Sequence, residues 1–297
     1  MNYRNSLLLL LLGVLVSTVS FAQIAQGDKA YARMAYPQAI SYYESGLKKD
    51  TANFAAWAKL ADCYRQVSDA KNAESAYEKV VASNSAGADE HYLYILSMME
   101  NTHYAEAKNE ISKFSSAYAG DARIDLLTKC TRNLDEYLQK KNSYSVKSVN
   151  TNGMSSDICP VQYGDGIVFI SDRGALSSKK LTNSGTNRPF YAPYYAKGTG
   201  SSFDAPSRFD TYQTNDYHSG PLTFNSNGKL MVITRSNTID GKTTKDDQGV
   251  VRLQLYSSAK GEKEWGLEVS MPFNSSNYSC MHPSLTADGN TLYFASD

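Results

Sequence analysis

The feature that most constrains this chain is a regular spacing of small residues in its N-terminal half. Ala39, Ala73 and Ala107 recur at one fixed interval. The residues four and seven positions after each alanine complete one stripe: Tyr43 and Gly46, Tyr77 and Val80, Ile111 and Phe114. Residues at such spacings share one face of an α-helix, and a period of about 34 residues is typical of stacked helix-turn-helix repeats. The sequence therefore predicts an all-α solenoid over residues 24–140, in which each alanine lies where two helices cross closely.

The middle copy carries the fullest pattern, with large and small residues at fixed positions of two helices. These positions are Trp57, Leu60, Ala61 and Tyr64 on the first helix and Ala73 and Tyr77 on the second. The pattern resembles the tetratricopeptide repeat (TPR), with alanine at position 61 where the family usually has glycine. Stacked hairpins of this kind present a concave surface that binds peptides or partner proteins. A short array can also act only as a spacer that positions the next domain, so both roles remain open.

A further periodic stretch follows the third copy and is predicted as a capping helix over residues 121–138. Ile124, Leu127 and Leu138 contribute to its apolar face, and a solenoid needs such a cap to cover its last hydrophobic surface. Cys63 and Cys130 fall on predicted helices, where free cysteines usually behave as small buried hydrophobic residues. A disulfide between these two cysteines remains an alternative.

Beyond a linker at residues 140–143, the apolar period changes from helical spacing to alternation, which marks a domain boundary. Three segments, residues 164–173, 227–236 and 288–297, share a tight turn, an apolar strand and a polar pair at the strand's end. Phe169, Ile233 and Phe294 take equivalent places in them, at nearly equal intervals. A repeat of about sixty residues with several short strands is typical of one propeller blade. The predicted fold class is therefore α+β multidomain, with an all-α TPR solenoid followed by an incomplete all-β propeller over residues 142–297.

Ten residues define the predicted propeller repeat by their place in the turns and at the strand ends. They are Phe169, Ser171, Asp172, His282, Pro283, Asp288, Gly289, Phe294, Ser296 and Asp297. His282 precedes a proline and is expected to make a hydrogen bond at the entry of its strand. The loop over residues 237–249 contains three aspartates, but not in the alternating order of a calcium loop, and is predicted as a solvated hairpin.

Two stretches, residues 220–229 and 272–297, resemble the WD-like, TolB-type propeller repeat of OmpA-family outer-membrane proteins of Bacteroidetes. In that family a signal peptide, TPR repeats and a propeller precede a small β domain and an OmpA-like domain that binds peptidoglycan. The resemblance implies that this chain corresponds to the first three parts. It is therefore expected to be an N-terminal fragment of a longer protein. Such proteins are associated with the type IX secretion or gliding machinery, which the resemblance implies here as well.

Residues 1–22 have the pattern of a secretory signal peptide. Arg4 precedes an apolar run over residues 7–16, and the small-residue site Ser20-Phe21-Ala22 follows. The run has about ten residues where a membrane-spanning helix needs about twenty. Cleavage is therefore expected before Gln23, with export of the remaining chain to the periplasm.

Charge and motif content exclude several classes of function. The chain has 30 basic and 30 acidic residues and no basic run, so a nucleic acid partner is not expected. The motifs of acyl transfer, metalloproteolysis and nucleotide binding are absent, and the four histidines and four cysteines lack metal-ligand spacing. No cofactor, metal site or enzymatic activity is therefore predicted. An aromatic-rich run over residues 190–217 either packs between strands or stacks on sugar rings.

These observations leave three hypotheses for the function. The predicted one is an exported, non-catalytic scaffold, located in the periplasm and associated with the outer membrane. Its partners would be envelope proteins, such as outer-membrane or secretion-machinery components, and peptidoglycan through a domain beyond residue 297. The alternatives are a glycan- or peptidoglycan-binding sensor module, and the N-terminal propeller part of a hydrolase whose catalytic domain follows.

Overall fold

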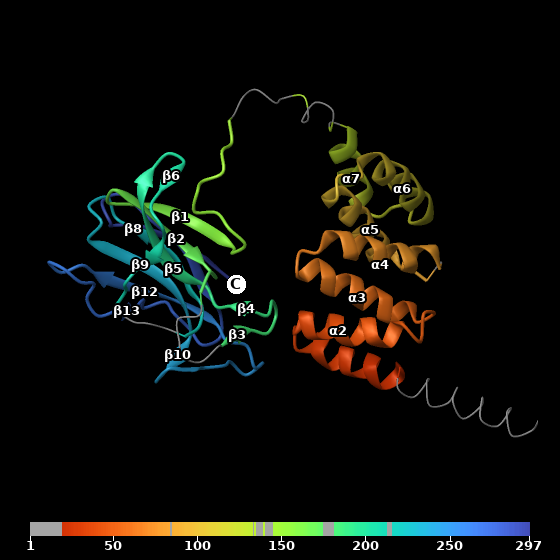
Figure 1. The fold of residues 1–297 in the computed structure, drawn as a ribbon, viewed down its shortest axis with the longest axis horizontal. Coiled ribbons are helices and arrows are strands. Elements are labelled where there is room, and N and C mark those ends of the chain that lie inside the picture. Colours follow the sequence, from red (N-terminus) through yellow and green to blue (C-terminus); the bar gives the residue numbers. More distant parts are fainter. Residues whose placement is uncertain are drawn as a thin grey trace, which may run out of the picture. The chain divides into compact units, whose positions relative to one another are not determined.

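The computed structural model describes residues 20–83, 85–132, 134, 139, 145–174, 181–212 and 216–297. It divides into two compact units, residues 1–144 with 184–187 and residues 145–183 with 188–297 (Figure 1). Residues 1–19 of the predicted signal peptide and Leu138 of the predicted capping helix lie outside the described residues. The two units are here called the helical unit and the β unit.

The described part of the helical unit consists of seven helices that stack in chain order as antiparallel hairpins (Figure 1). They are a helix over residues 20–32, α2 (Tyr36–Leu47), α3 (Phe54–Gln66), α4 (Ala70–Ala82), α5 (Ala88–Glu100), α6 (Tyr104–Ala117) and α7 (Arg123–Arg132). Three hairpins, each of two helices, are followed by α7 as the capping helix. The prediction of TPR-like helical repeats is confirmed.

One turn geometry joins the two helices of every hairpin. Met34, Ser68 and Thr102 have φ angles of 56°, 60° and 64°, and they recur with the same period as the crossing alanines. The next amide donates to a carbonyl five residues earlier: Ala35 to Ala30 (2.9 Å), Asp69 to Tyr64 (2.8 Å) and His103 to Met98 (2.9 Å). These bonds satisfy carbonyls that a helix end leaves free. The repeat period is therefore present in the turns as well as in the helix faces.

The second helices carry the closest contacts of the array. Ala39, Ala73 and Ala107 are each 0% exposed, at the same position of α2, α4 and α6. Gly46 departs from the large residues Val80 and Phe114 of the other copies. A Cβ atom at Gly46 would lie 2.7 Å from Cγ1 of Ile24, so the space is already filled from the first helix.

The described residues of the β unit form three antiparallel sheets. The first has the order β1 (Asp157–Tyr163), β2 (Gly166–Ser171), β5 (Ala192–Thr199) and β6 (Ser202–Phe203), with β7 (Ser207–Arg208) also on β5. The second has the order β13 (Val269–Ser270), β12 (Leu253–Ala259), β9 (Leu230–Ser236) and β8 (Ser219–Phe224). The third is the pair β14 (Cys280–Leu285) and β15 (Leu292–Ser296). Two small ribbons accompany them: β3 (Thr182–Asn183) with β4 (Arg188–Pro189), and β10 (Thr238–Ile239) with β11 (Lys242–Thr243).

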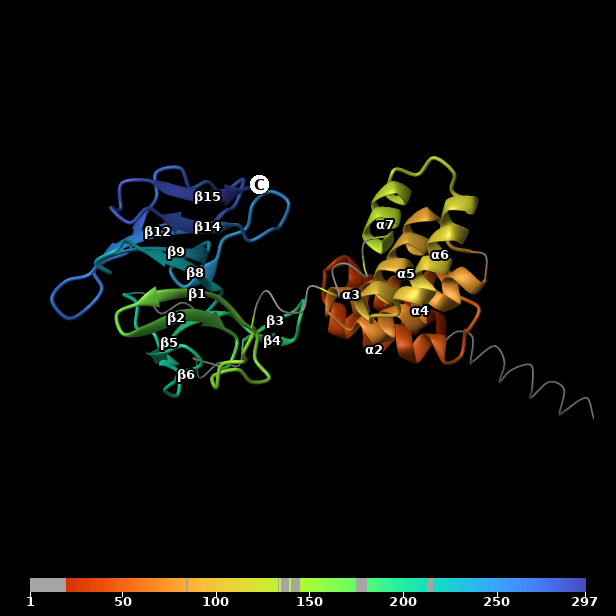
Figure 2. The same cartoon turned by 90° about the horizontal axis from the view of Figure 1, so that it is seen from above.

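The three sheets form layers in chain order, as Figure 2 shows. Val168, Ile170, Met231 and Ile233 are buried between the first and second sheets. Successive strand residues face opposite sides, so Val232 points the other way, where it packs with Leu255 of the same sheet and with Cys280 of the next layer. No closed barrel or propeller is formed by the residues that the structure describes. The incomplete propeller therefore remains a prediction.

The first strand of each layer carries the same irregularity. The pairing register shifts at Cys159-Pro160, Gly220-Pro221 and His282-Pro283, which lie at nearly equal intervals along the chain. The residue before each proline has a positive φ, of 50°, 104° and 54° in turn. Proline cannot donate a hydrogen bond to the ladder, which places it at bulges. This X-Pro bulge is a structural mark of the repeat in the β unit.

Candidate functional site

The predicted TPR residues form the interior of the helical unit. Leu60, Ala61, Tyr64 and Tyr77 are buried in one hydrophobic cluster with the three crossing alanines. Trp57 is half-buried, its Nε1 donates to the Thr51 carbonyl (3.1 Å), and the Lys79 ammonium lies 5.1 Å from its ring centre. These residues determine the stacking of the helices, and the binding surface must come from other positions.

Polar side chains link the first helices of the first two hairpins. Lys59 forms an ion pair with Asp28 (2.6 Å), and the Tyr31 hydroxyl donates to Asp62 (2.8 Å). Both pairs are 31 residues apart. Arg65 also pairs with Asp62 (2.7 Å). These five residues, the polar band, cover neighbouring first helices with charges that compensate one another.

Two positions of the polar band, those of Asp62 and Arg65, are apolar in the third hairpin, and the first of them is a cysteine in the cap. Leu96 and Met99 lie one repeat after Asp62 and Arg65, and Leu126 and Cys130 lie one repeat after Tyr92 and Leu96. Tyr92, Leu96 and Met99 are half-buried on α5, while Leu126 is 56% exposed and Cys130 is exposed on α7. We call these five residues, Tyr92, Leu96, Met99, Leu126 and Cys130, the apolar band.

The cap is fixed against the third hairpin by one arginine. The Arg123 guanidinium lies 4.8 Å from the ring centre of Tyr92 and pairs with Asp89 (2.7 Å), both on α5. It also pairs with Asp121 (2.6 Å), and hydrogen bonds from Arg123 lower the pKa of that carboxyl to about 2. The apolar band is therefore continuous from α5 to α7.

A buried carboxylate lies inside the third hairpin. Nε2 of His91 on α5 is 2.7 Å from Oε1 of Glu110 on α6, and Lys113 pairs with the other carboxylate oxygen (2.8 Å). Burial alone would raise the pKa of Glu110, but the hydrogen bonds from Lys113 and His91 outweigh it and hold that pKa below its usual value. A charged Glu110 thus joins the two helices, and its role is structural.

The predicted aspartates of the β unit lie at the ends of second strands and bind the preceding strand's entry. The Asp172 carboxylate accepts from the Ser156 amide (2.9 Å) and pairs with Arg188. Asp297 accepts from the Ser279 amide (2.6 Å). The two carboxylates therefore perform the same structural task in the first and third layers.

In the middle layer, an arginine near the end of β9 links strands instead. Arg235 of β9 donates to the Ser219 hydroxyl (2.7 Å) and forms an ion pair with Glu268, and both charged side chains are almost fully buried. Hydrogen bonds of this kind offset the cost of burying charge. In all three layers, a polar side chain near the end of a strand thus links that strand to its neighbour, and its role is structural.

The other predicted residues of the β unit lie in the core, in turns or at the surface. Ser171 is buried, and its hydroxyl accepts from Arg173, whose guanidinium lies 4.8 Å from the Phe169 ring centre. In the last turn, hydrogen bonds from Thr286 and Asn290 lower the pKa of Asp288, and Gly289 has a φ of 77°.

Four predicted residues lie in the last strand pair, and three of them are at the surface. Pro283 is buried, but His282 is exposed and makes no side-chain hydrogen bond to any described residue. The expected strand-entry bond is wrong because the bulge turns this side chain outward. On β15, Phe294 is exposed and stacks on Phe273 (4.4 Å between ring centres), and Ser296 is exposed.

An aromatic cluster lies where the first two sheets meet. Tyr163, at the end of β1, has four rings around it: Phe224 at 4.5 Å, Phe209 at 5.3 Å, and Tyr195 and Trp265 at 6.3 Å. Tyr194 of the predicted aromatic run is buried, whereas Tyr212 is 54% exposed. The run thus contains both rings that pack in the interior and rings that are exposed at the surface.

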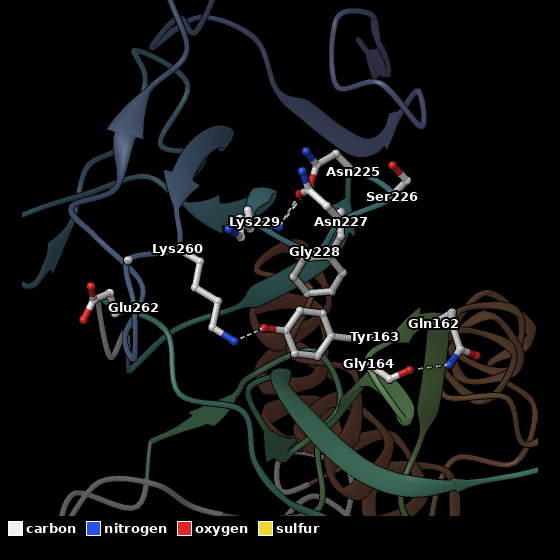
Figure 3. Close-up of a pocket in the computed structure, with 12 residues that line it drawn as sticks. Gln162, Tyr163, Gly164, Asn225, Ser226, Asn227, Gly228, Lys229, Lys260 and Glu262 are labelled. Atoms are coloured by element: carbon white, nitrogen blue, oxygen red, sulfur yellow. Dashed lines mark hydrogen bonds between the residues drawn. The ribbon is translucent and has the colours of Figure 1, made fainter.

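Two hollows open beside this cluster. The smaller, of 490 Å³, lies between the turns after β1 and β8 and the end of β12 (Figure 3). The larger, of 670 Å³, is lined by Tyr195, Arg208, Tyr212 and Trp265 among others. Tyr163 and Lys260 line both. Volumes of this size suit small organic ligands.

Lys260 is the central cation of the two hollows. Its ammonium donates to the Tyr163 hydroxyl (2.6 Å; Figure 3) and lies 5.1 Å from the Tyr163 ring centre and 5.9 Å from that of Trp265. No carboxylate among the described residues pairs with it. A lysine has three donors, so Lys260 keeps two for a ligand.

Two further groups set the electrostatics of the larger hollow. Arg208 has a buried Nη1 without a hydrogen-bond partner among the described residues, and burial lowers the pKa of its guanidinium. Tyr195 donates to Asp165, and burial together with this bond raises the pKa of Tyr195 to about 12. The tyrosine therefore stays neutral and its ring is held in place.

Within the described part of the chain, no group of three or more His, Cys, Asp or Glu side chains could hold a metal ion. No described helix is long and apolar enough to cross a membrane. All four cysteines are free, and Cys63 is buried while Cys130 is exposed. The prediction that Cys130 is a buried residue is wrong, because it occupies the outward position of the apolar band on α7.

Solved TPR domains are similar to this chain. The first TPR of Spaghetti (RPAP3) bound to the HSP90 peptide SRMEEVD is 20% identical and covers 41% of this chain and 95% of its own, with a TM-score of 0.35. The Arabidopsis OM64 TPR domain is 16% identical over 40% and 98%, with a TM-score of 0.35. The Sgt2 TPR domain from Aspergillus fumigatus is 18% identical over 46% and 91%, with a TM-score of 0.35. No protein-family model and no curated protein matches.

The aromatic-rich run includes Tyr195, Phe209 and Tyr212 of the larger hollow, but sequence reasoning missed the cations and Tyr163 beside them. Lys260 and Tyr163 are 97 residues apart, and neither belongs to a motif. Arg208 lies in a two-residue strand that no alternation reveals. The X-Pro spacing could have been found, since Cys159-Pro160 and Gly220-Pro221 precede His282-Pro283 at near-equal intervals.

Proposed function

We propose that this chain is a non-catalytic binding protein of the cell envelope, whose helical unit holds protein partners. The observation that carries the proposal is the change from Asp62 and Arg65 on the second hairpin to Leu96 and Met99 at the equivalent positions of the third, beside the apolar Tyr92 and Leu126. Stacked repeats place equivalent positions side by side. A partner segment that follows these positions meets compensated charges on the first two hairpins and apolar side chains on the third hairpin and cap.

The apolar band favours a partner over a spacer role. Leu126 is exposed and Tyr92, Leu96 and Met99 are only half-buried, although a spacer needs no apolar surface. Burial of an exposed leucine contributes about 1.5–3 kcal/mol. An amphipathic partner segment, apolar at one end and polar at the other, fits this arrangement best.

The experiment is photo-crosslinking in the intact source cell. The full-length protein carries a photoreactive residue at Leu126 or, as a control, at the exposed Ser112 on the second helix α6. A discrete product is expected from position 126 alone, and Leu96→Asp on α5 should remove it. Equal products from both positions, or a hydrolase activity of the purified full-length protein, would refute the proposal.

The location of this function is part of the proposal. The signal-peptide pattern supports export, and the resemblance to OmpA-family outer-membrane proteins supports a periplasmic place at the outer membrane. The same resemblance supports partners in envelope organisation or type IX secretion, with peptidoglycan bound by a further domain. Fractionation of source cells tests this: the protein should sediment with the outer membrane and not with the cytoplasm.

A second candidate function is saccharide binding by the β unit. Two hollows beside Tyr163, lined by aromatic rings and by amide and hydroxyl side chains, favour it. Ligand pockets combine apolar walls with a few placed polar groups. Calorimetric titration of the chain with neutral and acidic oligosaccharides tests this candidate directly.

A further inference from the structure

We infer that the two hollows beside Tyr163 form one site for a saccharide that carries a carboxylate, with Lys260 as the carboxylate-binding cation. This inference rests on the second candidate function and specifies its ligand. Three independent features carry it: the state of the Lys260 ammonium, the orientation of a nearby amide, and the exposed rings of the larger hollow.

The ammonium of Lys260 lacks an acidic partner among the described residues. One donor is used by the Tyr163 hydroxyl, and two remain. The residue is half-buried, and its ammonium lies beside the rings of Tyr163 and Trp265. A charge-assisted hydrogen bond to a carboxylate is stronger than one between neutral groups. A ligand carboxylate between the two hollows accepts that bond.

The other charges that line the hollows are mixed in sign. The cations are Arg208, Lys229, Lys260 and Lys263, and the acids are Asp210, Glu262 and Glu264. The acids are exposed, so solvent screens them. One excess cation with an unused pair of donors fits one carboxylate of a ligand whose other charged groups stay in solvent. A polyanion such as nucleic acid would require a larger excess.

The turn after β8 places two asparagine side chains at the smaller hollow. The side-chain carbonyl of Asn225 accepts from the Lys229 and Leu230 amides (3.1 and 3.0 Å), and that of Asn227 accepts from the Lys229 amide (2.9 Å). In Figure 3 both asparagines lie on the side of the hollow opposite Tyr163. Nδ2 of Asn225 lies beside Gly289 of the β14–β15 turn. Asn227 is therefore the side chain whose Nδ2 is available to a hydroxyl or carbonyl oxygen of a sugar.

The larger hollow supplies the ring surface. Tyr212 is 54% exposed and Tyr195 is half-buried with its hydroxyl fixed by Asp165. Aromatic side chains with an apolar face and a polar end suit ligands that present both C–H faces and hydroxyls. A saccharide has both, while its carboxylate meets Lys260. The combined volume accommodates about two sugar rings.

The test is isothermal titration of the full chain with a trimer of galacturonic acid and with galactotriose, which differ chiefly in their carboxylates. The acidic trimer is expected to bind about tenfold more tightly, the ratio of one charge-assisted hydrogen bond. Lys260→Met keeps the stem over Tyr163 and removes the charge, and should abolish this preference. Lys245→Met, at an exposed loop of the same unit, should leave it unchanged. Tyr212→Ala should weaken both trimers.

Each other outcome overturns a defined part of the inference. Equal affinity for both trimers, or a preference that survives Lys260→Met, leaves saccharide binding intact and refutes the carboxylate assignment. Inorganic phosphate competing as well as the acidic trimer, with no effect of Tyr212→Ala, reveals a simple anion site. Absence of binding by either trimer at millimolar concentration refutes the second candidate function and the inference together.

Discussion

At the residue scale, burial separates side chains that are chemically identical. Cys63 and Cys280 are buried, whereas Cys130 and Cys159 are exposed. Burial, with a contribution from Asp62, raises the pKa of the Cys63 thiol to about 12. Only the thiolate reacts as a nucleophile. Position in the fold therefore decides which thiols are chemically available.

We expect a maleimide to modify two cysteines of the native chain, Cys130 fastest. Cys159 should react more slowly, because partial burial raises the pKa of its thiol. Peptide mass mapping before and after denaturation measures this, with Cys63 and Cys280 labelled only afterwards. Protection of Cys130 in the native chain would show that the α7 face is assigned wrongly.

His218 is a second case, because the β unit keeps it neutral. Its Nδ1 accepts from the Tyr191 amide (3.2 Å), the Phe190 ring lies 4.8 Å away, and burial lowers the pKa of His218 from 6.5 to about 4. As pH falls, His218 thus binds a proton at a lower pH in the folded state than in the unfolded state. Stability that is present above about pH 6.5 should be lost as pH falls toward 4.

Acidification from pH 7 to pH 4.5 should therefore lower the free energy of unfolding of the β unit, with a contribution from this residue on the order of 2 kcal/mol. His218→Asn keeps an acceptor but cannot titrate in this range, so it should flatten the pH dependence. The exposed His282→Asn is the matched control. Fluorescence of Trp265 in a Trp57→Phe background reports the transition, and an unchanged slope in His218→Asn would exclude this cause.

At the element scale, the helical repeat depends on small residues at the hairpin crossings. Ala73 on α4 is 0% exposed, so Ala73→Phe should overpack the second hairpin by about 1–3 kcal/mol. Ser75→Phe adds the same ring to the exposed face of the same helix and serves as control. Circular dichroism during thermal unfolding should show a lower midpoint for Ala73→Phe only. Equal midpoints would mean that the register of the repeat is wrong.

The local pattern predicted the helices well because the residues that determine each hairpin lie within one repeat of the sequence. Ala39, Ala73 and Ala107 repeat at fixed spacing and all become core. The β unit was harder, since its layers depend on pairing between distant strands. The position of Lys260 over Tyr163 requires the register of β12 on β9 and the packing of two sheets, which no local spacing contains. The prediction that Cys130 is buried was wrong because cysteines are buried only on average, and the residue type alone does not give the burial of one position.

At the scale of the whole molecule, both units are repeats whose copies differ in surface chemistry. In the helical unit, Asp62 and Arg65 of the polar band are followed one repeat later by Leu96 and Met99 of the apolar band. In the β unit, Asp172, Arg235 and Asp297 lie near the ends of their strands and differ in charge, although each links its strand to the strand before it. Repetition thus maintains the fold, and departures from repetition provide the binding surfaces.

Export is the last expectation at this scale, and it bears on the first hairpin. Cleavage before Gln23 removes Ser20, whose hydroxyl donates to the Gly46 carbonyl (2.8 Å) in the interior. Ile24 and Ala30 stay, and both are buried, so the first hairpin should still form after losing one hydrogen bond, worth about 1 kcal/mol. N-terminal sequencing of the protein from the periplasm should begin at Gln23, and a purified chain starting there should keep the helical content of the hairpins. Recovery of Met1 in the membrane fraction would show instead that the apolar N-terminal run is retained as an anchor.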